Sequence, residues 1–132
     1  MKKLLIILLN CIVGTLYAQS IQSPSKEINV LFAISENGKP SYSIFYKNKP
    51  IIKESFLGIK LKEGGDLTSG FSIVGSHSSS FDEVWHPVVG EQTAIKNHYN
   101  EMIFELNQDN TSKKITIVFI IKVFFIFTIY LI

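Results

Sequence analysis

Residues 28–46 read INVLFAISENGKPSYSIFY, and this stretch decides the fold class. In its first half apolar side chains occupy every second position: Ile28, Val30, Phe32 and Ile34. That period places them on one face of a β-strand. Asn37-Gly38 follows, and both residue types tolerate the positive φ values that tight hairpin turns require. Alternation then resumes at Tyr42, Ile44 and Tyr46. The stretch therefore predicts a β-hairpin.

The chain on either side of this hairpin consists of short apolar runs separated by turn signals. Further short strands are expected at 51–52, 56–61, 71–74 and 115–121. Residues 76–80 are polar and expected to be exposed, whereas residues 81–97 follow neither a helical nor a strand period. No amphipathic helix or internal repeat is evident. Short strands with frequent turns predict an all-β chain folded as an antiparallel β-sandwich.

Residues 1–18 have the features of a signal peptide. Lys2 and Lys3 precede an apolar stretch from Leu4 to Leu16, and Ala18 is a small residue at the expected cleavage point. The apolar stretch is shorter than a membrane span normally is. We therefore expect an exported protein, periplasmic or at the cell surface, whose mature chain begins at Gln19.

Charge and cysteine content exclude several functions. Without Lys2 and Lys3, the 13 basic residues fall to 11, equal to the 11 acidic residues, and none is arginine. Nucleic-acid binding is therefore not expected. The one cysteine, Cys11, lies in the signal peptide, so the mature chain has no disulfide or cysteine-based metal site. A lipid-attachment role for Cys11 is the alternative to an inert residue, and the preceding Asn10 opposes it.

The C-terminal stretch 115–132 carries a single charge, Lys122, and allows three interpretations. Its length is near the lower limit for a transmembrane helix. Its β-branched and aromatic composition favours a strand, and the charges of Lys113 and Lys114 lie on the wrong side for a span that follows a signal peptide. The third interpretation is a strand followed by a tail that is not native coding sequence. We expect residues 120–132 to be such an anomalous apolar tail.

Two neighbouring segments carry the chemistry: FDEVWHPVVGE at 81–91 and KNHYNE at 96–101. Together they hold a tryptophan, carboxylates, histidines and asparagines. Proteins bind sugars with aromatic faces against C–H surfaces, and with carboxylates and amides on the hydroxyls. The stretch has that composition, and it predicts a carbohydrate-binding or interface role.

These segments resemble the N-terminal domain of glycoside hydrolase family 97, which comprises α-glucosidases and α-galactosidases of Bacteroidetes. The family pattern is acidic-Trp-x-Pro-Val-x-Gly-Glu followed by basic-Asn-His-Tyr-Asn-Glu. The matching residues are Asp82, Glu83, Trp85, Pro87, Val88, Gly90, Glu91, Asn97, His98, Tyr99, Asn100 and Glu101. Weaker similarity at 23–30, 38–42, 46–49 and 57–61 extends the resemblance over residues 19–119, which we take as the domain.

The resemblance implies an incomplete β-sandwich, of the galactose-mutarotase-like supersandwich type, that packs against a catalytic (β/α)8 barrel. It implies calcium-assisted hydrolysis of terminal α-glycosides, with an α-linked oligosaccharide as ligand. The catalytic residues come from the barrel and the calcium-binding glutamates lie beyond this portion, so no catalytic residue, cofactor or metal is expected in this chain. After Phe119 the family pattern turns polar while this sequence turns apolar, as expected for a frameshift or a truncated gene.

Five residues are the candidates for carbohydrate or interface binding: Trp85, Glu91, Asn97, His98 and Glu101. Each has a structural alternative. Trp85 is either a ligand-stacking residue on a loop or a packed core aromatic. Glu91 either binds a hydroxyl or caps the turn after Gly90. His98 is expected to make a structural hydrogen bond near the interface.

Other reactive groups carry no site of their own. The nine- and twelve-residue spacings of His77, His86 and His98 do not suit a zinc site. A glycosidase pair among the carboxylates needs a defined separation that sequence does not give, and the serines at 78–80 lack a nucleophile-elbow context. Three functions remain: the N-terminal sandwich of an α-glycosidase, a stand-alone secreted carbohydrate-binding module, or a small membrane-tethered protein anchored by residues 115–132, of which we favour the first.

Overall fold

The structure is a computed structural model that describes residues 18–109, 111–122 and 127–131. The proposed signal peptide, apart from Ala18, and Cys11 lie outside the described residues. The described part contains ten strands and no helix, so the predicted all-β antiparallel class is confirmed. The strands are β1 Ala18–Gln22, β2 Ile28–Ile34, β3 Pro40–Tyr46, β4 Lys49–Phe56, β5 Ile59–Lys60, β6 Asp66–Leu67, β7 Phe71–Trp85, β8 Ile95–Gln108, β9 Lys114–Lys122 and β10 Phe127–Leu131.

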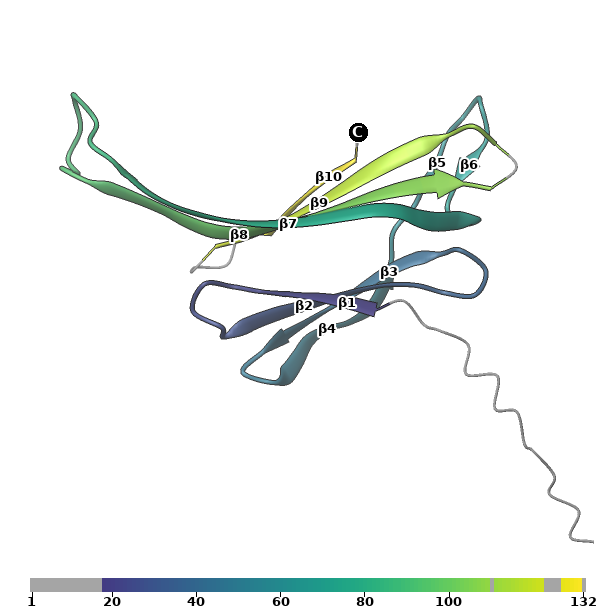
Figure 1. The fold of residues 1–132 in the computed structure, drawn as a ribbon, viewed down its shortest axis with the longest axis horizontal. Coiled ribbons are helices and arrows are strands. Elements are labelled where there is room, and N and C mark those ends of the chain that lie inside the picture. Colours follow the sequence, from purple (N-terminus) through teal and green to yellow (C-terminus); the bar gives the residue numbers. More distant parts are fainter. Residues whose placement is uncertain (1–17, 110, 123–126, 132) are drawn as a thin grey trace, which may run out of the picture.

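The first sheet is an antiparallel meander in the order β1-β2-β3-β4 (Figure 1). The predicted hairpin is confirmed as β2 and β3, which pair from Ile28 opposite Tyr46 to Ile34 opposite Pro40. Its turn uses Gly38 at φ +67°, where a Cβ atom would lie 2.4 Å from the backbone nitrogen of Phe71. Glycine is therefore needed there both for the turn and for the close approach of the other sheet.

The next hairpin joins β3 to β4 through Lys47 and Asn48, which have φ values of 47° and 65°. Two successive positive φ values are the signature of a type I′ turn. The predicted turn at 47–50 is thus present, but the strand after it is longer than the predicted 51–52. The strand predicted at 56–61 is reduced to β5, because the chain leaves the first sheet after Phe56.

The second sheet has the order β10-β9-β8-β7, and its long strands were the least predictable part of the fold. A short strand at 71–74 followed by an irregular stretch was expected, and that expectation is wrong. One strand of fifteen residues runs from Phe71 to Trp85. Four serines and His77 occupy both of its faces between Ser76 and Ser80, so no apolar period marks it. Its regularity comes from pairing with β8, broken only by a bulge at Val74.

The two sheets pack face to face around an apolar core. At its centre are the rings of Phe32, Phe104 and Phe119, with centroid distances of 4.2, 5.6 and 6.0 Å for the three pairs. All three are essentially fully buried. Aliphatic side chains complete this layer: Ile21, Ile28, Val30, Ile44, Leu106, Ile115, Ile117 and Ile121. Burial of each large side chain contributes about 1.5–3 kcal/mol.

The C-terminal stretch is strand wherever the structure describes it. Ile115, Ile117, Phe119 and Ile121 alternate into the core from β9, and β10 pairs antiparallel with β9. Within the described ranges, no helix has the length and apolarity needed to cross a membrane.

Strands β7 and β8 continue past the rest of the sheet. Among the described residues, the pairing of β9 with β8 runs as far as Lys122 opposite Tyr99, whereas β7 and β8 stay paired to Trp85 opposite Ile95. Residues 80–99 therefore form a two-stranded ribbon that projects beyond the first sheet (Figure 1). We call residues 80–99 the arm and the two packed sheets the body.

Candidate functional site

The arm contains most of the two segments that the sequence singled out. Residues 81–85 lie on β7, residues 95–99 lie on β8, and residues 86–94 form the loop at the tip. Antiparallel pairing sets Phe81 opposite Tyr99, Asp82 opposite His98 and Glu83 opposite Asn97. Residues that lie directly opposite each other in such a pair point to the same face. The arm therefore has two chemically distinct faces.

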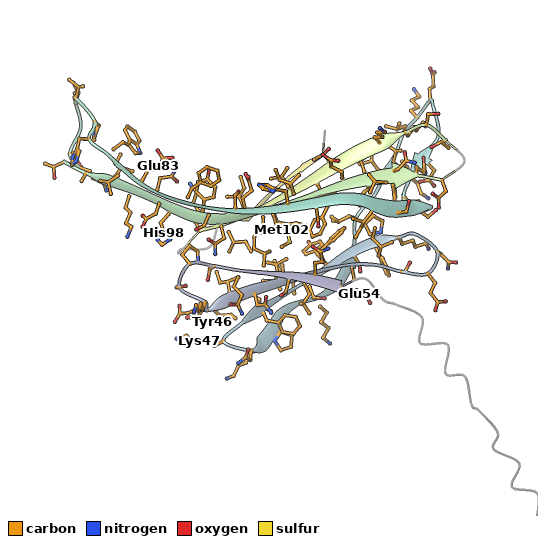
Figure 2. All side chains as sticks on the ribbon, viewed as in Figure 1. Tyr46, Lys47, Glu54, Glu83, His98 and Met102 are labelled. Atoms are coloured by element: carbon orange, nitrogen blue, oxygen red, sulfur yellow. The ribbon has the colours of Figure 1, made fainter. Side chains whose placement is uncertain are left out.

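The outer face points away from the first sheet. It carries Trp85, Glu83, Asn97 and Glu101 together with a stacked aromatic pair, Phe81 and Tyr99. The two rings have a centroid distance of 4.7 Å and an interplanar angle of 22°. Figure 2 shows Glu83 on this side of the ribbon and His98 on the other.

Carboxylates border the stacked pair. Glu101 accepts a hydrogen bond of 3.1 Å from the Ser79 hydroxyl. Desolvation raises the pKa of the Tyr99 hydroxyl above its usual value, and the charges of Glu101 and Glu83 raise it further. Tyr99 is thus a neutral hydrogen-bond donor at neutral pH, and an aromatic surface lies beside acceptor groups.

The inner face of the arm carries a cluster of opposite charges. The Asp82 carboxylate lies 3.8 Å from the Lys96 ammonium and 4.0 Å from the His98 imidazole Nδ1. The distance to His98 is too long for a hydrogen bond and makes an ion pair only when His98 is protonated. His98 therefore faces the side of the first sheet, opposite to Trp85 and Asn97.

The tip of the arm exposes apolar side chains. Trp85 is 52% exposed, Val88 is 100% exposed and Val89 is 89% exposed. The loop is closed by a 2.6 Å contact between His86 Nδ1 and the carbonyl oxygen of Thr93. The two interpretations from the sequence placed Trp85 on a loop or in the core. It is instead the last residue of strand β7 and is half-exposed.

The five predicted residues do not converge on one point. Trp85, Asn97 and Glu101 share the outer face, Glu91 lies on the exposed tip loop, and His98 is on the inner face. Six positions of β8 separate Glu101 from the partner of Trp85, which is about 20 Å along a strand. Phe81 and Tyr99 are not among the five residues predicted from the sequence. Phe81 is two residues from Glu83, and Tyr99 is two residues from Asn97. In a strand this spacing places each pair on the same face, so it would identify both aromatic residues once the register is known.

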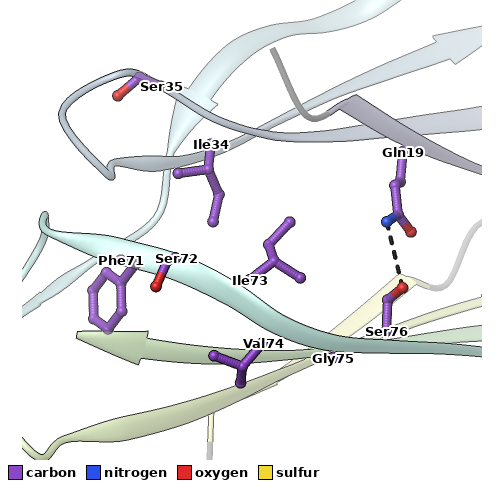
Figure 3. Close-up of a pocket in the computed structure, with 9 residues that line it drawn as sticks. All are labelled: Gln19, Ile34, Ser35, Phe71, Ser72, Ile73, Val74, Gly75 and Ser76. Atoms are coloured by element: carbon purple, nitrogen blue, oxygen red, sulfur yellow. Dashed lines mark hydrogen bonds between the residues drawn. The ribbon is translucent and has the colours of Figure 1, made fainter. Parts of the chain in front are cut away.

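The described ranges contain no group of three or more His, Asp or Glu side chains that could hold a metal ion. His77, His86 and His98 do not meet. Two open grooves lie where β1 runs alongside β7 and β8. One, of about 460 Å³, is lined by Gln19, Ile34, Ser35 and residues 71–76 (Figure 3). The other, of about 390 Å³, is lined mainly by serine, asparagine and glutamine side chains.

Comparison with known proteins places this geometry in context. Residues 21–124 match the family described as Glycosyl-hydrolase 97 N-terminal. The fold is similar to a Glycoside Hydrolase Family 97 enzyme from Pseudoalteromonas sp. strain K8, in complexes with panose and with acarbose. In both complexes the TM-score is 0.72 and the identity 25%, over 80% of this chain and 16% of that one. A β-arabinopyranosidase shares the fold with a TM-score of 0.68 and 20% identity, over 79% of this chain and 16% of that chain. This chain thus spans about a sixth of the enzymes it resembles.

Proposed function

Because the chain belongs to the Glycosyl-hydrolase 97 N-terminal family, we propose that it is the exported N-terminal sandwich of an α-glycosidase and has no catalytic activity of its own. One observation carries this proposal: the sandwich matches family enzymes over most of its own length and over only 16% of theirs. Hydrolysis of terminal α-glycosides would then be performed by a catalytic (β/α)8 barrel elsewhere in the intact enzyme. The signal-peptide features of residues 1–18 support the periplasm or the cell surface as its location.

The arm is the part of this chain that we assign to contact with the barrel. Val88 and Val89 at the tip are the most exposed of the large apolar side chains and lie next to the half-exposed Trp85, whereas the exposed apolar residues of the body, such as Phe56 and Val74, are less exposed than these two valines. A tryptophan beside exposed aliphatic residues is typical of interaction surfaces, where such residues provide most of the binding free energy. The charged groups Asp82, Lys96 and His98 beside it would form a polar rim to that contact.

The outer face of the arm would provide carbohydrate contacts next to the barrel. The Phe81–Tyr99 stack offers an apolar surface for the C–H face of a sugar ring, and Glu83, Asn97 and Glu101 offer hydrogen-bond partners for hydroxyls. An α-linked oligosaccharide is the ligand class that the family implies. The described ranges contain no group of three or more acidic or histidine side chains that would fit a calcium ion, so we propose that the calcium the family implies is held by other residues of the intact enzyme.

A stand-alone carbohydrate-binding module is the second candidate function. The same stacked pair favours it, because it is solvent-accessible without any partner domain: Phe81 is 37% exposed. The two functions differ in what they require. The first needs a catalytic domain for activity, whereas the second predicts sugar binding by the isolated chain.

A reconstitution experiment separates them. The purified chain is mixed with the catalytic domain of a family 97 enzyme lacking its own N-terminal sandwich, and both complex formation and α-glycoside hydrolysis are measured. We expect a complex that raises hydrolysis, and loss of that complex when the tip is changed by W85A/V88S/V89S. The matched control S55A, on edge strand β4, should leave the complex intact. Sugar binding by the chain alone, with no complex, would instead establish the stand-alone module.

A further inference from the structure

Among the described strands, β7 has the least protected sheet edge. Strand β7 ends the second sheet, and in the described ranges β8 is the strand that pairs with it. The first nitrogen of the strand, that of Phe71, donates to the Gly38 carbonyl at 2.9 Å. In the part of the chain that the structure describes, residues 72–85 make backbone hydrogen bonds within their own sheet only. Their outward N–H and C=O groups are therefore available to another strand.

Proteins normally protect such an edge with lysine, proline, irregular pairing or short length. Strand β4, which is an edge of the first sheet, has Lys49, Pro50, Lys53 and two register shifts. Strands β1 and β10 have five residues each in the described ranges. Strand β7 has fifteen residues, no lysine and no proline, and its only irregularity is the bulge at Val74. A long regular segment, 75–85, lies between that bulge and the tip loop.

We infer that residues 75–85 pair antiparallel with the same residues of a second copy of this chain, around a two-fold axis at Ser80. The result is one continuous sheet that runs through both copies. In a two-fold antiparallel pair each residue i lies opposite residue 160 − i of the partner when the axis is at position 80. This register is the only one that uses the whole segment, because 75 then meets 85. An axis shifted by one residue shortens the overlap at both ends.

The sequence GSHSSSFDEVW is complementary to itself in this register. On the outer face His77 lies opposite Glu83, Ser79 opposite Phe81, and Gly75 opposite Trp85. On the inner face Ser78 lies opposite Asp82, Ser76 opposite Val84, and Ser80 opposite Ser80 of the other copy. No two like charges meet, the ring of Trp85 covers a glycine, and Asp82 meets a hydroxyl donor. Such cross-strand pairs determine register and partner in antiparallel sheets.

The first sheet is compatible with this arrangement. Strand β1 runs beside β7 on the same side of the body, where Gln19 Nε2 lies 3.3 Å from the Ser76 hydroxyl (Figure 3). The Asn100 side chain donates to the Gln22 carbonyl at 2.7 Å. Since β1 is also an edge strand, the two copies of β1 approach each other when the two β7 edges pair. The polar groove lined by Ser78–Ser80 then lies at the two-fold axis.

A charge-swap experiment tests the register. Sedimentation velocity of the purified chain should show a concentration-dependent dimer. H77E places glutamate opposite Glu83 twice per dimer and should raise the dimer dissociation constant about tenfold. The double variant H77E/E83K restores opposite charges and should recover the dimer. Within one chain, Ile103 lies opposite His77 and Asn97 lies opposite Glu83. Neither partner is charged, so the substitutions break no ion pair between β7 and β8. The control S55E adds the same charge to edge strand β4 and should change nothing.

Thiol cross-linking tests the axis directly. In a background with Cys11→Ser, S80C should be joined into a dimer by a short bis-maleimide, because the two thiols face each other. S72C, on the same strand, should not, because its two copies would be about 50 Å apart. A chain that stays monomeric, an H77E effect that E83K does not reverse, or equal cross-linking at both positions would overturn the inference. None of these outcomes depends on whether a catalytic domain binds the arm.

Discussion

The body and the arm are made from the same two strands, yet their surroundings differ completely. Along β8, Phe104 and Leu106 are fully buried between the sheets. Five to nine positions earlier, Asn97 and Tyr99 belong to the arm, which projects beyond the first sheet (Figure 1). At the tip Val88 is entirely exposed. The body therefore has the burial that stability requires, whereas the arm has the exposed aromatic and apolar groups that binding requires.

The largest stability effect is expected in the body. Phe104→Ala removes a ring that is 0% exposed and contacts both Phe32 and Phe119. It should lower the free energy of unfolding by about 3–5 kcal/mol, as measured by urea denaturation. Phe81→Ala, the matched change on the arm, should cost less than about 1 kcal/mol because that ring is partly exposed. Equal losses of unfolding free energy in the two variants would contradict the division between a stable body and an exposed arm.

A smaller but clear effect is expected at the β2–β3 turn, which contacts the first residue of β7 in the other sheet. Gly38→Ala introduces a side chain at φ +67° and places a Cβ atom 2.4 Å from the Phe71 nitrogen. The cost should be about 1–3 kcal/mol. Gly90→Ala on the arm also has a positive φ, but no atom lies within 4 Å of the added methyl group. Its exposed loop should relax and lose less in the same denaturation series; a larger loss at Gly90 would show that the tip is a rigid part of the fold.

The smallest stability effect should come from the tip itself. W85A/V88S/V89S removes side chains that the body does not cover, so the free energy of unfolding should change by less than about 0.5 kcal/mol. The same variant should lose binding to a catalytic domain. A thermal melt together with the binding assay separates the two quantities. A strongly destabilised variant would mean that the tip packs against its own chain.

The sequence predicted the body better than the arm, for physical reasons. In β2 and β3 one face is buried, so apolar residues alternate from Ile28 to Tyr46 and the hairpin could be identified together with its turn. In β7, residues 76–80 beside β1 are serines and a histidine, and residues 81–85 lie on the arm beyond the first sheet, so no apolar period exists. That segment is a strand because it pairs with β8, which comes later in the chain. A local sequence pattern does not predict the register of such a pairing.

The candidate residues were predicted by composition, and their arrangement was not. Trp85, Asn97 and Glu101 were singled out and share the outer face, but His98 lies on the opposite face. A one-residue step along a strand reverses the face, so neighbours in a motif such as Asn97-His98 point in opposite directions. The motif alone does not reveal this until the residues are known to form a strand. The binding roles of these residues stay a prediction.

Hydrogen exchange of the chain, with and without the catalytic domain of a family 97 enzyme, is the most direct test of the account. Alone, amides of the body such as those of Phe104 and Phe119 should exchange slowly, and amides of the tip loop 86–94 should exchange rapidly. With the catalytic domain, protection should appear in that loop, which lies outside the segment proposed to pair between two copies. Binding that protects the body and leaves residues 86–94 unchanged would contradict the claim that the arm is the contact surface.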